Sequence, residues 1–212
     1  MRSIIFVNGD LHHHDLIKKF IRSDDFLIAA DGGLTHIQKI DLQPHLVIGD
    51  LDSINLEDQQ WLKSAGIEIA QFPAEKDQTD LELAIAESIK RESRVIVIIA
   101  ATGGRLDQTL ANLMLMLDAR LENVDVRLED GKEEIFFIDR CAEVVGNIGD
   151  RVSLLAINGT VKGIETKNLK YPLAKETLVP GQTRGISNIM LEKRARIDVK
   201  SGRLLCIHTR MN

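Results

Sequence analysis

The sequence predicts an α/β domain with a mostly parallel sheet flanked by helices, followed by a small all-β sandwich domain. Up to about residue 140, short β-branched apolar runs alternate with amphipathic stretches of helical period, which is typical of a parallel sheet covered on both faces. Beyond that point, turn signals such as Asn158-Gly159 and Ser201-Gly202 separate short apolar runs, and no long helical period remains. We therefore expect one domain over residues 1–140 and a second over residues 141–212.

The expected strands of the first domain are buried apolar runs that end in Gly, Asp or Pro. They cover Ser3–Val7, Phe26–Ala30, Leu46–Ile48, Ile67–Ala70 and Val95–Ala100. The helical patterns between them lie near His14–Arg22, Leu34–Ile40, Leu56–Ser64, Asp80–Arg91 and Asp107–Leu121. The strands expected in the second domain are Arg151–Ile157, Ser187–Lys193, Ala195–Lys200 and Arg203–Thr209. In sheets of the first kind, ligands bind beyond the carboxyl ends of the strands, so the residues there are the first candidates for a site.

Composition excludes several classes of partner. The chain has 212 residues, is 44% hydrophobic and 28% charged, and carries a net charge of −5, with no basic stripe for nucleic acid. No apolar run reaches membrane-spanning length, and the apolar N-terminus is too short for a signal sequence, so we expect a cytoplasmic protein with no membrane partner. Cys141 and Cys206 lack metal-ligand spacing and lie in apolar runs, so we interpret them as reduced core thiols.

Asp50 and Asp52 directly follow an expected strand, in Gly49-Asp50-Leu51-Asp52-Ser53. In an extended segment, side chains two residues apart project to the same side, so both carboxylates would converge while Leu51 points to the core. Two carboxylates that close repel each other unless a cation neutralises them, and magnesium takes oxygen ligands together with water and substrate phosphates. The alternative is an ordinary turn, for which these residue types are also suited.

Three further segments place acids after expected strands. Asp31-Gly32-Gly33 follows the second strand, and Lys76-Asp77-Gln78-Thr79-Asp80 opens a helix, where Thr79 and Glu82 also fit a capping box. Thr102-Gly103-Gly104-Arg105 runs from a strand into a helix near Asp107 and Gln108. It offers backbone N–H groups and a guanidinium for an anion, or a tight turn with Asp107 as its N-cap. No P-loop pattern is present, and Asn8-Gly9-Asp10 is too short for a dinucleotide fingerprint.

The combination is more informative than its members. Four acid-bearing loops at one edge of one sheet, beside an arginine and a glycine turn, supply carboxylates for a cation and donors for phosphates. Independent turns and caps have no reason to gather in this way. The pattern therefore favours a site for a metal–nucleotide complex.

In this order, the four segments resemble the motifs of the thiamine pyrophosphokinase family. The resemblance continues into the second domain at Leu169-Lys170-Tyr171-Pro172-Leu173 and Gly185-Ile186-Ser187-Asn188, so it covers nearly the whole chain. Two positions depart from the family. Asn168 stands where many relatives have Gly, and asparagine tolerates left-handed backbone. No tryptophan follows Ser187-Asn188, as it does in animal and fungal members; the only one is Trp61, in the first domain.

The resemblance implies a diphosphokinase that transfers the terminal pyrophosphate of ATP to the hydroxyl of thiamine, giving thiamine diphosphate and AMP. It implies a homodimer with thiamine held between subunits. It also implies Mg²⁺ held on the ATP phosphates by Asp50, Asp52 and Asp80, with Asp77 nearby. The nucleotide would be lined by Asp31, Gly32, Gly33, Lys76, Thr102, Gly104, Arg105, Asp107 and Gln108.

The same resemblance implies that Ser187 and Asn188 face thiamine, and that the reaction uses Asp52, Asp80 and Asp107. Either Asp80 or Asp107 would accept the hydroxyl proton. Three alternatives stay open: a diphosphokinase for another hydroxymethyl heterocycle such as a reduced pterin, a non-catalytic nucleotide sensor, and a metal-dependent phosphohydrolase.

Two smaller features complete the predictions. Three adjacent histidines, His12, His13 and His14, cannot all face one ion in regular structure, so we interpret them as a solvated loop, with proximity to the nucleotide as the alternative. The helix over Asp107–Leu121 is apolar almost all round, so we expect it to be buried on more than one side, in the core or at a subunit interface.

Overall fold

The computed structural model describes residues 1–52 and 54–211. The chain forms two compact units, Met1–Gly131 and Lys132–Asn212, and each is described by itself. The predicted fold class is confirmed, because the first unit is an α/β unit with a parallel sheet and the second contains only strands.

The sheet of the first unit has the strand order β6-β5-β1-β2-β3-β4, and its neighbouring strands are all parallel. The strands are β1 (Arg2–Phe6), β2 (Phe26–Ala30), β3 (Leu46–Gly49), β4 (Glu68–Gln71), β5 (Val95–Ile99) and β6 (Asp125–Glu129). The chain adds β2, β3 and β4 on one side of β1 and then returns to place β5 on the other side. The carboxyl ends of β1 and β5 therefore form the switch point of the sheet, where such folds bind their ligands.

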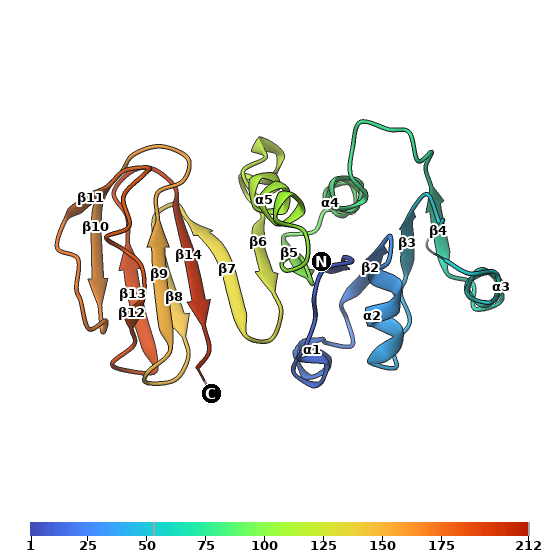
Figure 1. Ribbon diagram of the computed structural model, residues 1–212, viewed down its shortest axis with the longest axis horizontal. Helices are drawn as coiled ribbons and strands as arrows, with labels where there is room; N and C mark the ends of the chain where they lie inside the picture. The colour runs from blue at the N-terminus through green and yellow to red at the C-terminus, as the bar shows by residue number, and fades with distance from the viewer. Residues whose placement is uncertain (53, 212) are drawn as a thin grey trace. The chain divides into compact units, whose positions relative to one another are not determined.

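Helices lie on both sides of this sheet. Figure 1 shows α1 (His14–Phe20) and α2 (Gly33–Lys39) on one side, and α4 (Asp80–Lys90) and α5 (Leu106–Leu115) on the other. The remaining helices are α3 (Leu56–Ser64) and the short 3₁₀ helix η1 (Ala119–Leu121). No helix in the described part of the chain is long and apolar enough to cross a membrane.

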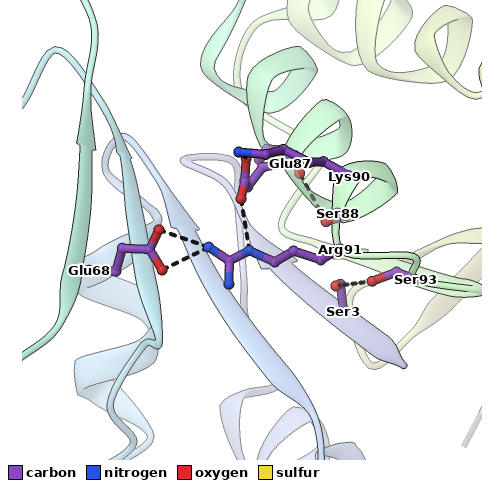
Figure 2. Close-up of polar contacts among 8 residues, drawn as sticks. Ser3, Glu68, Glu87, Ser88, Lys90, Arg91 and Ser93 are labelled. Carbon is purple, nitrogen blue, oxygen red and sulfur yellow. Dashed lines mark hydrogen bonds and ion pairs between the residues drawn. The ribbon is translucent and has the colours of Figure 1, made fainter.

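The start of α4 is fixed by side-chain capping and its end by an ion pair. The Thr79 hydroxyl accepts a hydrogen bond from the N–H of Glu82 at 3.2 Å, as the capping box predicts. At the other end, the Arg91 guanidinium donates to both carboxylate oxygens of Glu68 on β4, at 2.7 and 2.8 Å, and to Glu87 at 2.8 Å (Figure 2). Arg91 also lies over the Phe26 ring, 4.6 Å from its centroid. These contacts hold the C-terminal end of α4 against β4, the edge strand.

Burial of the helix after β5 in the core on more than one side is wrong, while its burial at a subunit interface stays a prediction. The helix ends at Leu115 rather than Leu121, and three of its apolar side chains are exposed: Leu106 by 72%, Leu110 by 48% and Met114 by 51%. These residues are four apart, so they form one exposed stripe. The apolar pattern is real, but the chain itself covers only the opposite face of the helix, where Asn112 is buried.

The second unit is a β-sandwich of two antiparallel sheets, with orders β12-β9-β14-β7 and β11-β10-β13-β8. Both sheets contribute side chains to one core, which includes Phe136, Val144, Ile164 and Ile197. The strands are β7 (Glu133–Ile138), β8 (Cys141–Val145), β9 (Arg151–Leu155), β10 (Val161–Lys167), β11 (Glu176–Leu178), β12 (Asn188–Ile189), β13 (Arg194–Asp198) and β14 (Leu204–Thr209).

Three details of the second unit differ from the sequence interpretation. The strand expected over Ser187–Lys193 is reduced to the two residues of β12, because the chain turns again immediately after it. β7 pairs with β14 and so lies within the second unit, which begins at Lys132. The division of functions between residues 1–140 and residues 141–212 stays a prediction. Cys206 is buried, as expected, but Cys141 is exposed rather than in the core, because it begins β8 on the outer face.

A buried carboxylate, Asp150, organises one end of the sandwich. Its Oδ2 accepts hydrogen bonds from the N–H of Asn147 at 2.8 Å and lies 3.1 Å from Nε2 of the buried His208. Its Oδ1 accepts from the N–H of Met211 at 3.0 Å, and its carbonyl oxygen accepts from the N–H of Met190 at 2.9 Å. One residue therefore ties together the β8–β9 turn, β14, the C-terminal segment and the segment after β12.

The same contacts predict how the stability of the second unit depends on pH. Burial by itself would raise the pKa of Asp150, but the N–H groups of Asn147 and Met211 and the His208 imidazole outweigh it and hold the pKa below its ordinary value of 3.8. A carboxyl group whose pKa is lowered by folding contributes stability above its unfolded pKa and loses it as pH falls through the folded value. We therefore expect the sandwich to lose stability steeply below about pH 4.

Chemical denaturation followed at pH 7 and at pH 3 measures this effect. In D150N the carboxamide cannot ionise, so this variant is less stable at pH 7 but loses less of its stability between the two pH values. An equal loss in D150N and in the native chain would contradict the role of Asp150.

Candidate active site

A cavity of about 370 Å³ lies at the switch point of the first unit. Its walls come from the loops that follow β1, β2 and β5 and from the first turns of α5. The lining residues are Asn8, Gly9, Asp10, Asp31, Ala101, Gly103, Gly104, Arg105 and Gln108. Backbone amides, a guanidinium and carboxylates therefore meet in one space at the end of the sheet where ligands bind.

Three carboxylates converge beside this cavity. One oxygen each from Asp31, Asp50 and Asp52 lies within 4.8 Å of the other two. Asp31 also lines the cavity, so the cluster and the cavity share a wall. The donor set consists only of carboxylate oxygens, which suits a hard cation such as magnesium.

The carboxylates converge through a tight turn, and the expectation of an extended segment is wrong. Leu51 has a φ of +66°, a left-handed conformation that is rare for a large side chain. The Oδ1 of Asp50 accepts a hydrogen bond from the N–H of Asp52 at 3.1 Å, which closes the turn. Leu51 still packs against the core of the unit, as expected. Ser53, the last residue of this motif, lies outside the described residues.

Asp50 is stabilised as a carboxylate. The N–H of Asp52 lowers its pKa most, and the side chain of Asp52 and the ammonium of Lys76 lower it further. Lys76 also lies near Asp80, with Nζ 3.1 Å from Oδ1. The positive charge of Lys76 therefore lies close to both Asp50 and Asp80.

Asp80 belongs to the same acidic region. Its carboxyl carbon lies next to Gly49, the residue that ends β3, since a Cβ built there would be in ordinary contact with it at 3.6 Å. Its Oδ1 is buried and makes no hydrogen bond, since the ion pair with Lys76 is not aligned for one. A buried carboxylate oxygen with unused capacity fits a cation. Asp77 is exposed on the loop before α4 and is not among the three converging acids of the described residues.

The turn between β5 and α5 is held open by Asp10. Gly103 and Gly104 have φ values of +85° and +60°, which glycine adopts without strain. The Oδ2 of Asp10 accepts a hydrogen bond from the N–H of Gly104 at 3.0 Å, and a Cβ on Gly103 would lie 2.4 Å from the same oxygen. Asp10 therefore packs directly beneath the turn and fixes its shape.

Arg105 and Asp107 form an exposed pair at the mouth of the cavity. Nε and Nη2 of Arg105 donate to the two oxygens of Asp107 at 3.1 and 2.5 Å. The Arg105 guanidinium and the N–H of Gln108 hold the pKa of Asp107 below its usual range. The helix begins at Leu106, so Asp107 is not its N-cap.

The other predicted nucleotide residues lie around the cavity rather than in its lining. Gly32 and Gly33 allow α2 to approach β1, because Cβ atoms there would lie 2.5 Å from the side chain of Asn8 and 2.0 Å from the carbonyl oxygen of Phe6. The carbonyl oxygen of Thr102 accepts the N–H of Asp10 at 3.0 Å. Their roles toward a nucleotide stay predictions.

Sequence analysis missed the contribution of the first loop. Asn8 and Asp10 line the cavity, and the ring nitrogen Nε2 of His36 lies 3.0 Å from the carbonyl oxygen of Gly9, which anchors that loop to α2. The signal was available, because these residues follow the first strand as the acids follow the others. His12 and His13 are exposed, as a solvated loop requires, but the interpretation is wrong for His14, which is the first residue of α1 and has a buried Nε2.

In the second unit, Ser187 and Asn188 lie at the start of β12. Ser187 has a φ of +56°, and its N–H donates to the hydroxyl of Ser153 at 3.0 Å. The amide of Asn188 is buried and bonds to both backbone polar groups of Tyr171. Asn168 has a φ of +63°, as expected for a residue in a glycine position. The predicted contacts of Ser187 and Asn188 with thiamine stay predictions.

An α/β unit with a polar site at its switch point, followed by a β-sandwich, is the architecture of a two-domain enzyme. Residues 17–128 match the family description "Thiamin pyrophosphokinase, catalytic domain", and residues 139–204 match "Thiamin pyrophosphokinase, vitamin B1 binding domain". The chain therefore belongs to the thiamin pyrophosphokinase family, whose members are transferases of thiamine diphosphate biosynthesis.

Individual relatives support this assignment. The chain is 28% identical to the thiamine pyrophosphokinase of Bacillus subtilis over 184 residues, which cover 86% of each chain. The crystal structure of a thiamine pyrophosphokinase from the same organism has the same fold, with a TM-score of 0.88, 23% identity and full coverage of both chains. The crystal structure of a thiamin pyrophosphokinase from Geobacillus thermodenitrificans gives a TM-score of 0.84 at 25% identity. The match covers 99% of this chain and 97% of the Geobacillus chain.

Crowding of the three carboxylates predicts opposite effects of one substitution with and without metal. D52N removes one repelling charge, so in EDTA we expect it to melt at a higher temperature than the native chain. It also removes a metal ligand, so the rise in melting temperature that excess Mg²⁺ gives the native chain should be lost. Differential scanning calorimetry in EDTA and in Mg²⁺ measures both.

D24N is the matched control, because Asp24 is an exposed acid just before the start of β2, whereas the three acids follow the ends of β2 and β3. It should keep the native response to Mg²⁺. If D52N gains as much stability from Mg²⁺ as the native chain does, the three acids are not the metal site.

Proposed function

We propose that the chain transfers the terminal pyrophosphate of ATP to the hydroxyl of thiamine, with Mg²⁺ as cofactor, and releases thiamine diphosphate and AMP. The observation that carries the proposal is the convergence of Asp31, Asp50 and Asp52 beside the cavity, in a chain that has both domains of the family. The hydroxyl oxygen bonds to the β-phosphorus, the bond from that phosphorus to the α–β bridging oxygen breaks, and AMP leaves with this oxygen.

Asp50, Asp52 and Asp80 are the proposed magnesium ligands, and Asp31 is added to them because its carboxylate lies within the cluster. Asp77 is proposed to act through water, since magnesium keeps part of its hydration shell. When bound, the ion neutralises charge on the phosphates and on the acids.

The phosphates are proposed to bind at the turn formed by Gly103, Gly104 and Arg105. Arg105 is exposed and bound only to its neighbour Asp107 among the contacts described, so it can exchange a carboxylate for a phosphate of similar geometry. Gln108 lies on the same wall of the cavity. Lys76, already beside Asp50 and Asp80, adds positive charge on the other side.

The hydroxyl proton passes to a carboxylate, and the structure favours Asp80 over Asp107 for this role. Asp107 is held ionised by Arg105, which lowers its pKa and makes it a weak base. Asp80 is paired with Lys76, whose Nζ lies 3.1 Å from Oδ1, so this role requires Lys76 to turn from Asp80 toward the phosphates. The role of Asp107 is then to orient Arg105.

Thiamine is proposed to bind the second domain, over residues 141–212, while the domain over residues 1–140 holds the nucleotide and the metal. The match of residues 139–204 to a vitamin B1 binding domain supports this division. A homodimer is proposed as well, because Leu106, Leu110 and Met114 form an exposed apolar stripe of the kind that subunit interfaces cover. We propose a cytoplasmic location, a compartment in which thiols such as that of the exposed Cys141 stay reduced.

The reaction is tested by incubating the purified chain with thiamine, ATP and Mg²⁺ and quantifying products by mass spectrometry. Thiamine diphosphate and AMP should appear in equal amounts. D52N should lower kcat/KM by at least about 100-fold, because several kcal/mol of charge stabilisation are lost. D24N should retain native activity.

Other products would contradict the proposal in specific ways. Thiamine monophosphate with ADP would mean that only the γ-phosphoryl group is transferred. Inorganic phosphate released without any thiamine product would indicate a phosphohydrolase.

A further inference from the structure

Tyr171 is the only aromatic residue between positions 139 and 204, the range that matches the vitamin B1 binding domain. It lies between β10 and β11, and 59% of its surface is exposed. A large aromatic side chain is normally at least partly buried, because its removal from water is favourable. More than half of the surface of Tyr171 is accessible, so a ligand can cover it.

The backbone of Tyr171 is held by one buried side chain. Its N–H donates to Oδ1 of Asn188 at 2.9 Å, and its carbonyl oxygen accepts from Nδ2 of Asn188 at 2.7 Å. The N–H of Ile189 donates to the same Oδ1 at 2.9 Å. Asn188 is only 5% exposed, so its amide is used within the protein and is not free for a substrate.

The segments on both sides strengthen this link. The N–H of Lys170 donates to the carbonyl oxygen of Ile189 at 2.9 Å, and Leu169 forms a bridge with Met190. The backbone before the ring is thus tied to β12 by several hydrogen bonds. A ring presented from a fixed backbone loses little conformational entropy when a ligand stacks on it.

The chemistry of thiamine suits such a ring. Thiamine has two heteroaromatic rings, of which the thiazolium is a cation, and aromatic faces attract both flat rings and cations. The ammonium of Lys170 already lies 5.6 Å from the centroid of the Tyr171 ring, within the reach of a cation–π contact. The ring is therefore accessible to positive charge on at least one face.

We propose that Tyr171 is the aromatic surface on which the thiamine cation stacks, and that Asn188 is a positioning residue that holds Tyr171 in place. This inference rests on the proposed function, since it names a contact for that substrate. In this proposal the exposed ring of Tyr171 contacts thiamine directly, and the buried Asn188 acts only by holding the backbone of Tyr171.

The test compares Y171A with Y171F in steady-state kinetics and in calorimetric binding of thiamine. Y171A removes the ring, so KM and Kd for thiamine should rise about tenfold while KM for ATP stays unchanged. Y171F keeps the ring and removes only the hydroxyl, so it should stay within about twofold of the native chain. N188A should raise KM for thiamine in the same direction, again without changing KM for ATP.

The outcomes separate this inference from the proposed function. If the native chain makes no thiamine diphosphate, the proposed function fails, whatever the variants do. If the native chain is active and Y171A binds thiamine as tightly as Y171F does, the stacking role is wrong. A change in oligomeric state of Y171A at unchanged thiamine affinity would likewise overturn it and identify the ring as a protein contact. Because Tyr171 is exposed, Y171A decides the question even if N188A does not fold.

Discussion

Electrostatic repulsion among Asp31, Asp50 and Asp52 is the constraint on which the site depends. Three carboxylates whose oxygens lie within 4.8 Å of one another are stable only if the backbone holds them or a cation neutralises them. The chain does the first with a left-handed Leu51 at +66° and a left-handed Asp31 at +50°, two conformations that cost energy in most contexts. The ammonium of Lys76 supplies part of the neutralising positive charge, because it acts on Asp50. The parallel sheet places the three acids at one edge, since Asp31 follows β2 and Asp50 and Asp52 follow the neighbouring strand β3.

The two units fix their loops by the same physical means. In the first unit, Asp10 accepts the N–H of Gly104 and so sets the turn that carries Arg105. In the second, Asp150 and Asn188 use all or most of their polar capacity on backbone groups, which holds the segments around β12. Buried polar side chains of this kind specify one loop conformation, because any other leaves a donor or acceptor unsatisfied. Residues that face outward, such as Tyr171 and Arg105, can then meet a ligand from a fixed backbone.

The sequence was sufficient for the fold class and for the region of the site, because apolar runs and strand-end acids are local patterns. It predicted β2 at Phe26–Ala30 and α3 at Leu56–Ser64 with the observed bounds. It missed β6, β7, β8, β10 and β11, whose mixed polar sequences become strands only through pairing with distant partners. It did not decide whether the helix after β5 is buried in the core or at a subunit interface, since periodicity shows that a helix is apolar but not whether the same chain covers it. The support given by Asp10 and Asn188 depends on contacts 94 and 17 residues away, which no local pattern reports.

The most direct measurement of the central claim is a crystal structure with Mn²⁺ in place of Mg²⁺ and a non-hydrolysable ATP analogue, with the metal located by anomalous scattering. We expect a metal peak within about 2.5 Å of oxygens from at least two of Asp31, Asp50 and Asp52, with the analogue's phosphates beside Arg105. A metal bound elsewhere, with these three carboxylates unliganded and the cavity at the switch point empty, would contradict it.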